Sequence, residues 1–294
     1  MFETRAGTAT AVLPRRWLAA LAAGAAAAAT LPRPALAQGA PLRVGLMLPF
    51  SGTFAALGEN IAAAIELHLA ERGGRMGGRP LQLIRLDDES NPANAVQNAN
   101  RLVGRDRAEV LIGTVHSGVV MALVQISRER GIPLIIPNAG NVAATRELCA
   151  PSIFRSSFSN WQPAYGMGLA LGKHGVKRAA WMTWDYAAGN EAGEGFRQGL
   201  AGGGGEVVRE LKLPFPETNF QPLLAQIPGL NVEAVGSFFA GGGAVQFVRE
   251  YAAAGLKERI PLCGSGFLTE GVLGPQGAAA EGIRTALHYG DGLD

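Results

Sequence analysis

Groups able to bind a carboxylate are concentrated in one short loop, TVHS at residues 114–117, between an apolar run and a helix-period segment. The loop carries the hydroxyls of Thr114 and Ser117, the imidazole of His116 and the N-terminus of the expected helix. Hydrogen bonds and the helix dipole both stabilise an anion at such a position. This loop is therefore a candidate carboxylate site.

Two further loops offer compatible donors. Asn138 provides a side-chain amide and Ala139 a backbone N–H in the sequence PNAG at 137–140. The apolar run 42–48 leads into a Ser/Gly turn at the start of a helix, where free N–H groups form a natural anion site. Both loops favour a small anionic ligand.

Aromatic side chains stand near the same loops. They are Phe54, Trp161, Tyr186 and Phe239. Because rings prefer offset or edge-on ring partners, these positions would suit a benzoate-like ring. Ordinary alternatives stay open: His116 as a loop histidine, and Trp161 as packing beneath a hinge. Trp181 and Trp184 alternate along one strand and are expected in the core.

The triple glycine at residues 241–243 lacks the Lys-Ser/Thr of a P-loop. We expect Gly241 to permit close approach of the backbone to a ligand or tight helix packing. Phe267, in the sequence SGF at 265–267, is expected to close the site from below.

Catalytic and metal chemistry are not indicated. The chain has no Gly-x-Ser-x-Gly motif, and Ser117 beside His116 has no evident acidic third member. The acidic run 87–89 resembles a metal cluster, but the adjoining Ser90-Asn91-Pro92 is a helix start, which favours capping. We predict no catalytic residues, no metal site and no cofactor.

The elements that position these groups alternate along the chain. One series predicts strands at 42–48, 80–86, 110–113 and 132–136, with helices at 55–72, 92–105 and 118–130. A second predicts strands at 178–184, 206–213, 232–239 and 260–263, with helices at 189–201, 219–227 and 244–254. This order indicates an α/β fold with parallel sheets covered by helices on both faces. Ligands of such sheets bind beyond the carboxyl ends of the strands, so the loops 50–57, 114–117, 138–141, 185–189 and 240–243 should face one cleft.

The N-terminus has the pattern of a cleavable export signal. Arg15 and Arg16 precede an apolar run over 17–30, and Ala-Leu-Ala at 35–37 predicts a mature chain beginning at Gln38. The run is shorter than the roughly 20 residues of a membrane span. Export to the periplasm is expected, by a Sec or a twin-arginine route.

Composition excludes a nucleic-acid partner. The formal net charge is +2, and removing residues 1–37, with four Arg and one Glu, leaves −1, so the basicity belongs to the signal. Cys149 and Cys263 are the two cysteines. An oxidising compartment would permit a disulfide between them, and two free thiols are the alternative.

An ordered set of motifs over residues 42–294 resembles the periplasmic solute-binding proteins of branched-chain amino-acid-type ABC transporters. The set comprises GLMLPFSG at 45–52, Gly58, Asn60, GRMGGRPL at 74–81, Asp87-Asp88, Pro92, Ala95, Gly113, GIP at 131–133, Pro261-Leu262 and Glu281-Gly282. The resemblance implies two Rossmann-like lobes of the type I binding-protein fold, joined by three crossings and closing on a ligand by hinge motion. It implies no enzymatic activity, a monomer, and delivery of the ligand to a permease at the inner membrane.

The resemblance also gives domain boundaries. Residues 1–37 form the signal, 41–152 plus 261–294 the first lobe, and 153–260 the second. Relatives continue well past residue 294, so the resemblance implies a C-terminally truncated member with an incomplete first lobe.

The absence of an acidic side chain from one loop indicates the class of ligand. Amino-acid binders of this family hold the ammonium with an acidic side chain, commonly in the loop written here FAGGGAVQ at 239–246, which has no Asp or Glu. A buried ammonium without a carboxylate partner is costly, unless Asp185 or Glu191 substitutes. The strings FSNWQ at 158–162, FFAGGG at 238–243 and PNAG at 137–140 resemble the aromatic-acid branch. We therefore predict an aromatic carboxylate, with a branched-chain or other amino acid, or a ligand-sensing role, as alternatives.

Overall fold

A computed structural model describes residues 39–289 of the chain. The predicted signal at 1–37 and its cleavage site before Gln38 lie outside the described residues. Of these, residues 41–289 belong to one compact unit. Among the described residues, no helix combines the length and apolar character needed to cross a membrane.

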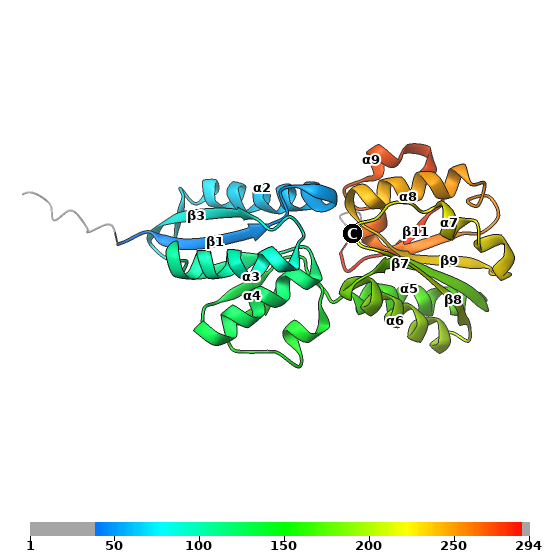
Figure 1. Cartoon of the computed structure of the whole chain (residues 1–294), viewed down its shortest axis with the longest axis horizontal. Coiled ribbons are helices and arrows are strands. Elements are labelled where there is room, and N and C mark those ends of the chain that lie inside the picture. Colours follow the sequence, from blue (N-terminus) through cyan, green and yellow to red (C-terminus); the bar gives the residue numbers. More distant parts are fainter. Residues whose placement is uncertain (1–38, 290–294) are drawn as a thin grey trace, which may run out of the picture. The chain divides into compact units, whose positions relative to one another are not determined.

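The first sheet has strand order β2-β3-β1-β4-β5-β6. Its strands are β1 (Leu42–Leu48), β2 (Arg75–Met76), β3 (Arg79–Asp87), β4 (Val110–Gly113), β5 (Leu134–Ile136) and β6 (Ile153–Arg155). All pairs are parallel except β2 with β3. Helix α2 (Ala55–Glu71) lies on one side of the sheet, and α3 (Pro92–Asn100) and α4 (Ser117–Arg130) lie on the other (Figure 1).

The alternation of side chains along β1 explains this layering. Met47 joins the apolar cluster that includes Ala95 of α3 and Val119 of α4. Its neighbours Leu46 and Leu48 pack with Ala62 of α2. Successive strand residues point to opposite faces, so one apolar run fills two cores.

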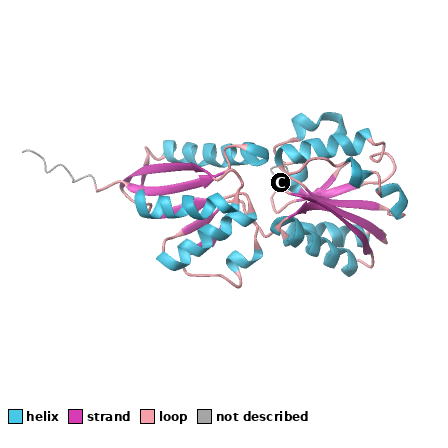
Figure 2. Ribbon diagram, in the orientation of Figure 1, coloured by secondary structure: helices cyan, strands magenta, loops and turns pink. Residues whose placement is uncertain are grey.

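The second sheet has strand order β11-β10-β9-β7-β8, and all its pairs are parallel. Its strands are β7 (Arg178–Asp185), β8 (Glu206–Pro214), β9 (Ala234–Phe238), β10 (Leu262–Ser265) and β11 (Arg284–Ala286). Helices cover both sides of this sheet (Figure 2): α5 (Trp161–Lys173), α6 (Ala187–Gly202), α7 (Gln221–Leu224), α8 (Gly241–Ala253) and α9 (Leu273–Gln276). Trp181 and Trp184 are fully buried here, as the sequence predicts.

The predicted division into lobes needs correction at both boundaries. Strand β10 pairs with β9, and β11 pairs with β10, so residues 262–286 extend the second sheet instead of returning to the first. Strand β6 pairs with β5 and belongs to the first sheet, although residues 153–155 were expected in the second lobe. Within residues 39–289, the chain passes between the sheets after β6.

In both sheets, the strand that comes first along the chain lies between the next two long strands of that sheet. In the first sheet β1 lies between β3 and β4, and in the second β7 lies between β8 and β9. The strand order reverses direction at each of these points, where parallel sheets bind ligands at the carboxyl ends of their strands. Each sheet thus offers two loops at such a point.

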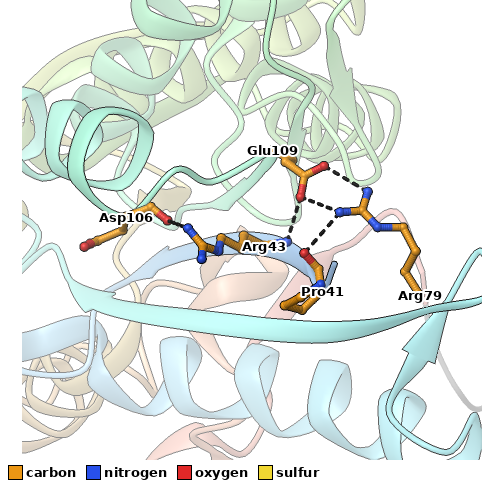
Figure 3. Close-up of polar contacts among 5 residues, drawn as sticks. All are labelled: Pro41, Arg43, Arg79, Asp106 and Glu109. Atoms are coloured by element: carbon orange, nitrogen blue, oxygen red, sulfur yellow. Dashed lines mark hydrogen bonds and ion pairs between the residues drawn. The ribbon is translucent and has the colours of Figure 1, made fainter. Parts of the chain in front are cut away.

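The amino ends of β3, β1 and β4, at the end of the first sheet opposite the carboxyl ends of its strands, are linked by hydrogen bonds. The Arg79 guanidinium donates to both oxygens of Glu109, at 2.9 and 2.8 Å, and to the Pro41 carbonyl at 3.1 Å (Figure 3). The Arg43 N–H donates to the same carboxylate at 3.2 Å. Although an exposed ion pair contributes little alone, this bidentate arrangement aligns three strands far from the candidate site.

The two cysteines are both free, Cys149 exposed and Cys263 buried. Of the alternatives left open by the sequence, the structure shows the two free thiols.

Candidate ligand-binding site

Loops from the two sheets meet where the strand orders reverse. After β1, the Thr53 hydroxyl accepts a hydrogen bond at 3.0 Å from the N–H of Gly243 in the first turn of α8. The carboxylate of Glu191, on α6, accepts the Val142 N–H at 3.1 and 3.2 Å. These bonds join the strand-end loops of both sheets around a common site.

Five aromatic rings from both sheets pack together there. His116 lies 4.8 Å from Tyr186 and 4.8 Å from Phe215, measured between ring centroids. Phe215 in turn lies 5.3 Å from Phe54 and 5.2 Å from Trp184. Most of these rings meet at a tilt or edge to face, as aromatic pairs prefer. We call these five residues the ring cluster.

Glycine permits the close approach of α8 to the loop after β1. Gly241 has φ of +57°, and a Cβ there would lie 2.1 Å from the Thr53 carbonyl oxygen. A Cβ on Gly243 would lie 2.3 Å from the Trp184 ring. The glycines therefore provide tight packing, one of the two roles expected from the sequence.

His116 is a neutral donor at the start of α4. Its Nδ1 accepts the N–H groups of Gly118 at 3.0 Å and Val119 at 3.3 Å, which caps the helix. Burial lowers the pKa of His116 to about 4, so the ring is uncharged at neutral pH. With Nδ1 accepting, the proton of the neutral ring is assigned to Nε2, which is left as a hydrogen-bond donor.

Other predicted carboxylate donors are engaged within the protein. The Ser117 hydroxyl accepts from Asn160 Nδ2 at 3.1 Å, and the Ala139 N–H donates to the Thr114 carbonyl at 2.9 Å. The Thr114 hydroxyl donates to the buried carboxylate of Asp88. Burial raises the pKa of Asp88 to about 6, against the opposing effect of that hydrogen bond. The Ala139 N–H is thus already used, whereas the Ser117 hydroxyl acts only as an acceptor in its bond and keeps its O–H available as a donor.

The two acidic side chains considered for an ammonium differ in availability. Glu191 accepts from Val142 and, at 2.8 Å, from Asn160 Nδ2, and burial raises its pKa above the usual value. Asp185 is exposed at the end of β7 and accepts from Asn190 at 3.1 Å. Glu191 is thus committed to linking loops, and Asp185 lies at the rim.

Two cavities border the ring cluster. A small one of about 10 Å³ is lined by Phe54, Asn138, Tyr186 and Phe267 of the predicted residues, and by Asn160 and Phe238 among others. A larger one of about 600 Å³ is lined by residues that include His116, Tyr186, Phe215, Pro92, Asp185 and Lys212. The structure brings most predicted site residues to these two spaces.

Two predicted aromatic contacts lie elsewhere. The Trp161 ring stacks on Tyr165 at 4.3 Å, and its Nε1 donates to Gln198 at 3.1 Å, so it packs between α5 and α6. Phe239 is fully buried against Phe247 at 4.4 Å and belongs to the core of the second sheet. Its neighbour Phe238 borders the small cavity instead, because adjacent residues at a strand end face opposite sides.

Phe215, Phe238 and Asn160 are site residues that the sequence interpretation missed. Phe215 follows β8, between Pro214 and Pro216. An aromatic residue between a proline that ends a strand and a second proline, as expected for a loop that starts at a strand end, was the available signal. Asn160 directly precedes α5, a helix that the sequence interpretation did not predict.

The acidic run near the site serves turn geometry. Asp87 accepts the N–H groups of Phe50 at 2.9 Å and Glu89 at 2.8 Å, and Asn91 caps α3. Within residues 39–289 no group of three or more His, Cys, Asp or Glu side chains is arranged to hold a metal ion.

A family comparison identifies this architecture. The periplasmic binding protein family model matches residues 41–294. The chain belongs to this family. The two-sheet architecture of a type I periplasmic binding protein is thereby confirmed.

Solved structures of related periplasmic binding proteins resemble the chain closely. One is a solute-binding protein of an ABC transporter from R. palustris in complex with benzoate. It is 49% identical with a TM-score of 0.84, over 86% of this chain and 70% of that chain. Another, from Rhodopseudomonas palustris BisB5 in complex with 3,4-dihydroxybenzoic acid, is 31% identical with a TM-score of 0.77, over 82% and 66% of the two chains.

A curated relative carries a different ligand in its name. The Leu/Ile/Val-binding protein homolog 6 of Brucella melitensis is 29% identical over 252 residues, which cover 84% of this chain. The match spans 64% of the length of that relative.

Proposed function

We propose that this periplasmic binding protein is the solute-binding component of an ABC transporter, and that it captures an aromatic carboxylate of the benzoate type. The observation that carries the proposal is the ring cluster, which receives rings from both sheets at the point where their strand-end loops meet. The benzoate complex of the R. palustris protein supports the same ligand class.

The rings supply a site for an aromatic ligand. Phe54 and Tyr186 border the small cavity, and His116 and Tyr186 border the larger one. A ligand ring held against these faces and edges gains both burial and aromatic contact energy. The small cavity of about 10 Å³ holds at most a single water, so the ligand enters while the two sheets stand apart.

The carboxylate would be held by neutral donors. His116 offers Nε2–H without carrying a charge, and the Asn138 amide borders the small cavity. Hydrogen bonds to an ionised acceptor are stronger than those between neutral groups. Two neutral hydrogen-bond donors suit a carboxylate that is buried together with its aromatic ring.

An α-amino acid is a poorer match. Its ammonium would need a carboxylate partner, and Glu191 is engaged with Val142 and Asn160. The loop 239–246 has no acidic side chain. Asp185 at the rim of the larger cavity favours amino-acid binding as the second candidate, in line with the names of the curated relatives.

The mechanism is closure on the ligand. A ligand shifts the equilibrium toward the closed arrangement only by the contacts that it makes there and not in the open one. The aromatic acid makes such contacts because His116 and Phe54 belong to the first sheet, and Tyr186 to the second. The closed protein, a monomer in the periplasm, would then dock on the permease.

Calorimetric titration of the purified protein with benzoate, 4-hydroxybenzoate and leucine tests the proposal. Trp184 lies in the ring cluster, so its fluorescence gives a second readout. We expect saturable binding and a fluorescence change with the aromatic acids, and neither with leucine. Binding of leucine but of no aromatic acid would overturn the proposal and favour the amino-acid alternative.

A further inference from the structure

Asn160 joins side chains of the two sheets through its amide nitrogen. It directly precedes α5 and is 3% exposed. Its Nδ2 donates to the Ser117 hydroxyl oxygen at 3.1 Å and to Glu191 Oε2 at 2.8 Å. Ser117 begins α4 beside the first sheet, and Glu191 lies on α6 beside the second. Both hydrogens of this amide nitrogen are therefore in use.

Glu191 determines which way the amide of Asn160 points. Its two carboxylate oxygens accept the Val142 N–H at 3.1 and 3.2 Å, and Oε2 also accepts from Asn160. An ionised carboxylate can only accept hydrogen bonds, so Asn160 must turn its nitrogen toward Glu191. The carbonyl end of the amide is packed closely, because a Cβ on Gly140 would lie 2.4 Å from Asn160 Oδ1. The amide is thus held in one orientation.

The orientation of Asn160 determines the role of the Ser117 hydroxyl. Because the Ser117 oxygen accepts from Asn160, its O–H remains as a donor. Ser117 is 1% exposed, and no acceptor within residues 39–289 forms a hydrogen bond with this O–H. A buried donor without an acceptor is costly. Asn160 itself lines the small cavity with Asn138 and Tyr186, so a carboxylate bound there would supply the missing acceptor.

We infer that Glu191 and Asn160 are positioning residues, which together hold the Ser117 hydroxyl as a hydrogen-bond donor to the ligand carboxylate. This inference rests on the proposed binding of an aromatic carboxylate. Glu191 acts on the ligand only through Asn160 and Ser117. The second sheet therefore sets the polarity of a donor that belongs to the first.

Glu191→Gln tests this chain of hydrogen bonds, because two explanations predict opposite signs. The introduced glutamine still accepts the Val142 N–H, but it can also donate to Asn160, whose amide can then turn over without a change of shape. The Ser117 O–H then bonds to the Asn160 oxygen instead of the ligand. We expect benzoate to bind about fivefold more weakly by calorimetry. Electrostatics alone predicts tighter binding, since a negative charge near an anion is removed.

A double-mutant cycle tests whether Asn160 acts through Ser117. Alone, Ser117→Ala and Asn160→Ala should each weaken benzoate about fivefold. In the Ser117→Ala background, the addition of Glu191→Gln or Asn160→Ala should change the benzoate Kd by less than about twofold. Residues with a merely structural role would give losses that add.

Asn98→Ala is the matched control. Asn98 Nδ2 also donates at 3.1 Å, to the Asp87 carbonyl, and it has no hydrogen bond with Ser117 or Glu191. Its benzoate Kd should equal that of the wild type. Thermal unfolding of every variant verifies the fold, and the isosteric Glu191→Gln keeps the test decisive if Asn160→Ala unfolds the protein.

The outcomes separate this inference from the proposed function. Benzoate binding that is unchanged or tighter in Glu191→Gln, or losses that add in the cycle, overturn the positioning role alone. Failure of the wild type and of all variants to bind any aromatic acid overturns both. Weaker binding by Glu191→Gln that disappears in the Ser117→Ala background supports the inference.

Discussion

The two sheets have the same strand order but carry different chemistry at the ends of their strands. Ignoring the edge strand β2, β3-β1-β4-β5-β6 and β8-β7-β9-β10-β11 are the same topology repeated. The first sheet supplies the imidazole of His116, the amide of Asn138 and one phenyl ring, Phe54, whereas the second supplies the rings of Tyr186, Phe215 and Phe238. Topology therefore determines where the strand-end loops lie, and the loop residues determine the balance of polar and aromatic groups that each sheet brings there.

The largest expected effect comes from moving the start of α8 in the second sheet away from the loop after β1 in the first. Gly241→Ala places a Cβ 2.1 Å from the Thr53 carbonyl oxygen and forces an alanine into φ of +57°. Because backbone cannot yield as a side-chain tip does, α8 must move away from the loop after β1. We expect benzoate to bind about 100-fold more weakly by calorimetry.

Gly242→Ala is the matched control for this change. Its Cβ would lie 3.6 Å from the Thr53 hydroxyl oxygen, which is ordinary contact. Affinity close to that of the wild type is expected. Equal weakening in both variants would show that the contact at Gly241 does not position the loops.

The buried carboxylate under the first-sheet loop predicts a pH-dependent stability. The pKa of Asp88, raised by burial to about 6, means that its ionised form is disfavoured in the folded state. Its contribution to stability is present at low pH and is lost as the pH rises from about 4 through about 6. Between pH 4 and pH 7, we expect the unfolding free energy of Asp88→Asn to gain about 2 kcal/mol relative to wild type.

Denaturant unfolding at several pH values measures this difference. Asp185→Asn, which changes an exposed carboxylate on the second sheet, should follow the wild type throughout. A constant offset between wild type and Asp88→Asn would contradict the proposed cost of ionisation.

The third prediction concerns the hydrogen-bond donor that His116 of the first sheet supplies. His116→Ala removes the Nε2–H donor and the cap of α4. We expect benzoate to bind about tenfold more weakly and the protein to lose about 1 kcal/mol of stability. His116→Asn retains a capping oxygen, so its stability should return toward wild type. Unchanged affinity in the alanine variant would remove His116 from the binding role.

The fold was predictable from the sequence largely because each apolar run forms one strand of one sheet. The expected strands at 42–48 and 110–113 match β1 and β4 at both ends. The three-residue strands β6 and β11 were missed because each contains an arginine and forms no apolar run, whereas the equally short β5 lies within the apolar run 132–136. The assignment of 262–286 to the first lobe was wrong, because β10 pairs with β9 of the second sheet. The sequence of a single strand does not show which other strand it will pair with.

The site was predictable at the level of loops and less so at the level of atoms. The positions of His116 and Tyr186 followed from strand ends, because the carboxyl ends of parallel strands meet at one edge. Whether a donor is available depends on its neighbours in space. The N–H of Ala139 is taken by Thr114, and Glu191 by Val142, through contacts between segments far apart in the sequence.

The smallest expected effect is that of removing an exposed ring from the first sheet, and a buried ring of the second sheet provides the contrast. On β5 and β6 of the first sheet, Ile135 is 37% and Phe154 57% exposed. Phe154→Ser should change the unfolding free energy by no more than about 0.5 kcal/mol. The corresponding change in the second sheet, Phe238→Ser, should cost about 3 kcal/mol because that ring is buried. Equal losses in denaturant unfolding would contradict this contrast.

The hydrogen bond from Gly243 to Thr53 has a consequence for the resting protein. Helix α8 has no side-chain cap of its own at Ala240, and the Thr53 hydroxyl from the other sheet supplies one. Any motion that parts the loops leaves a helix terminus uncapped, at about 1 kcal/mol. That cost shifts the population toward the closed form about fivefold before any solute arrives. Residue 53 can therefore adjust the apparent affinity for every ligand alike, without discriminating among them.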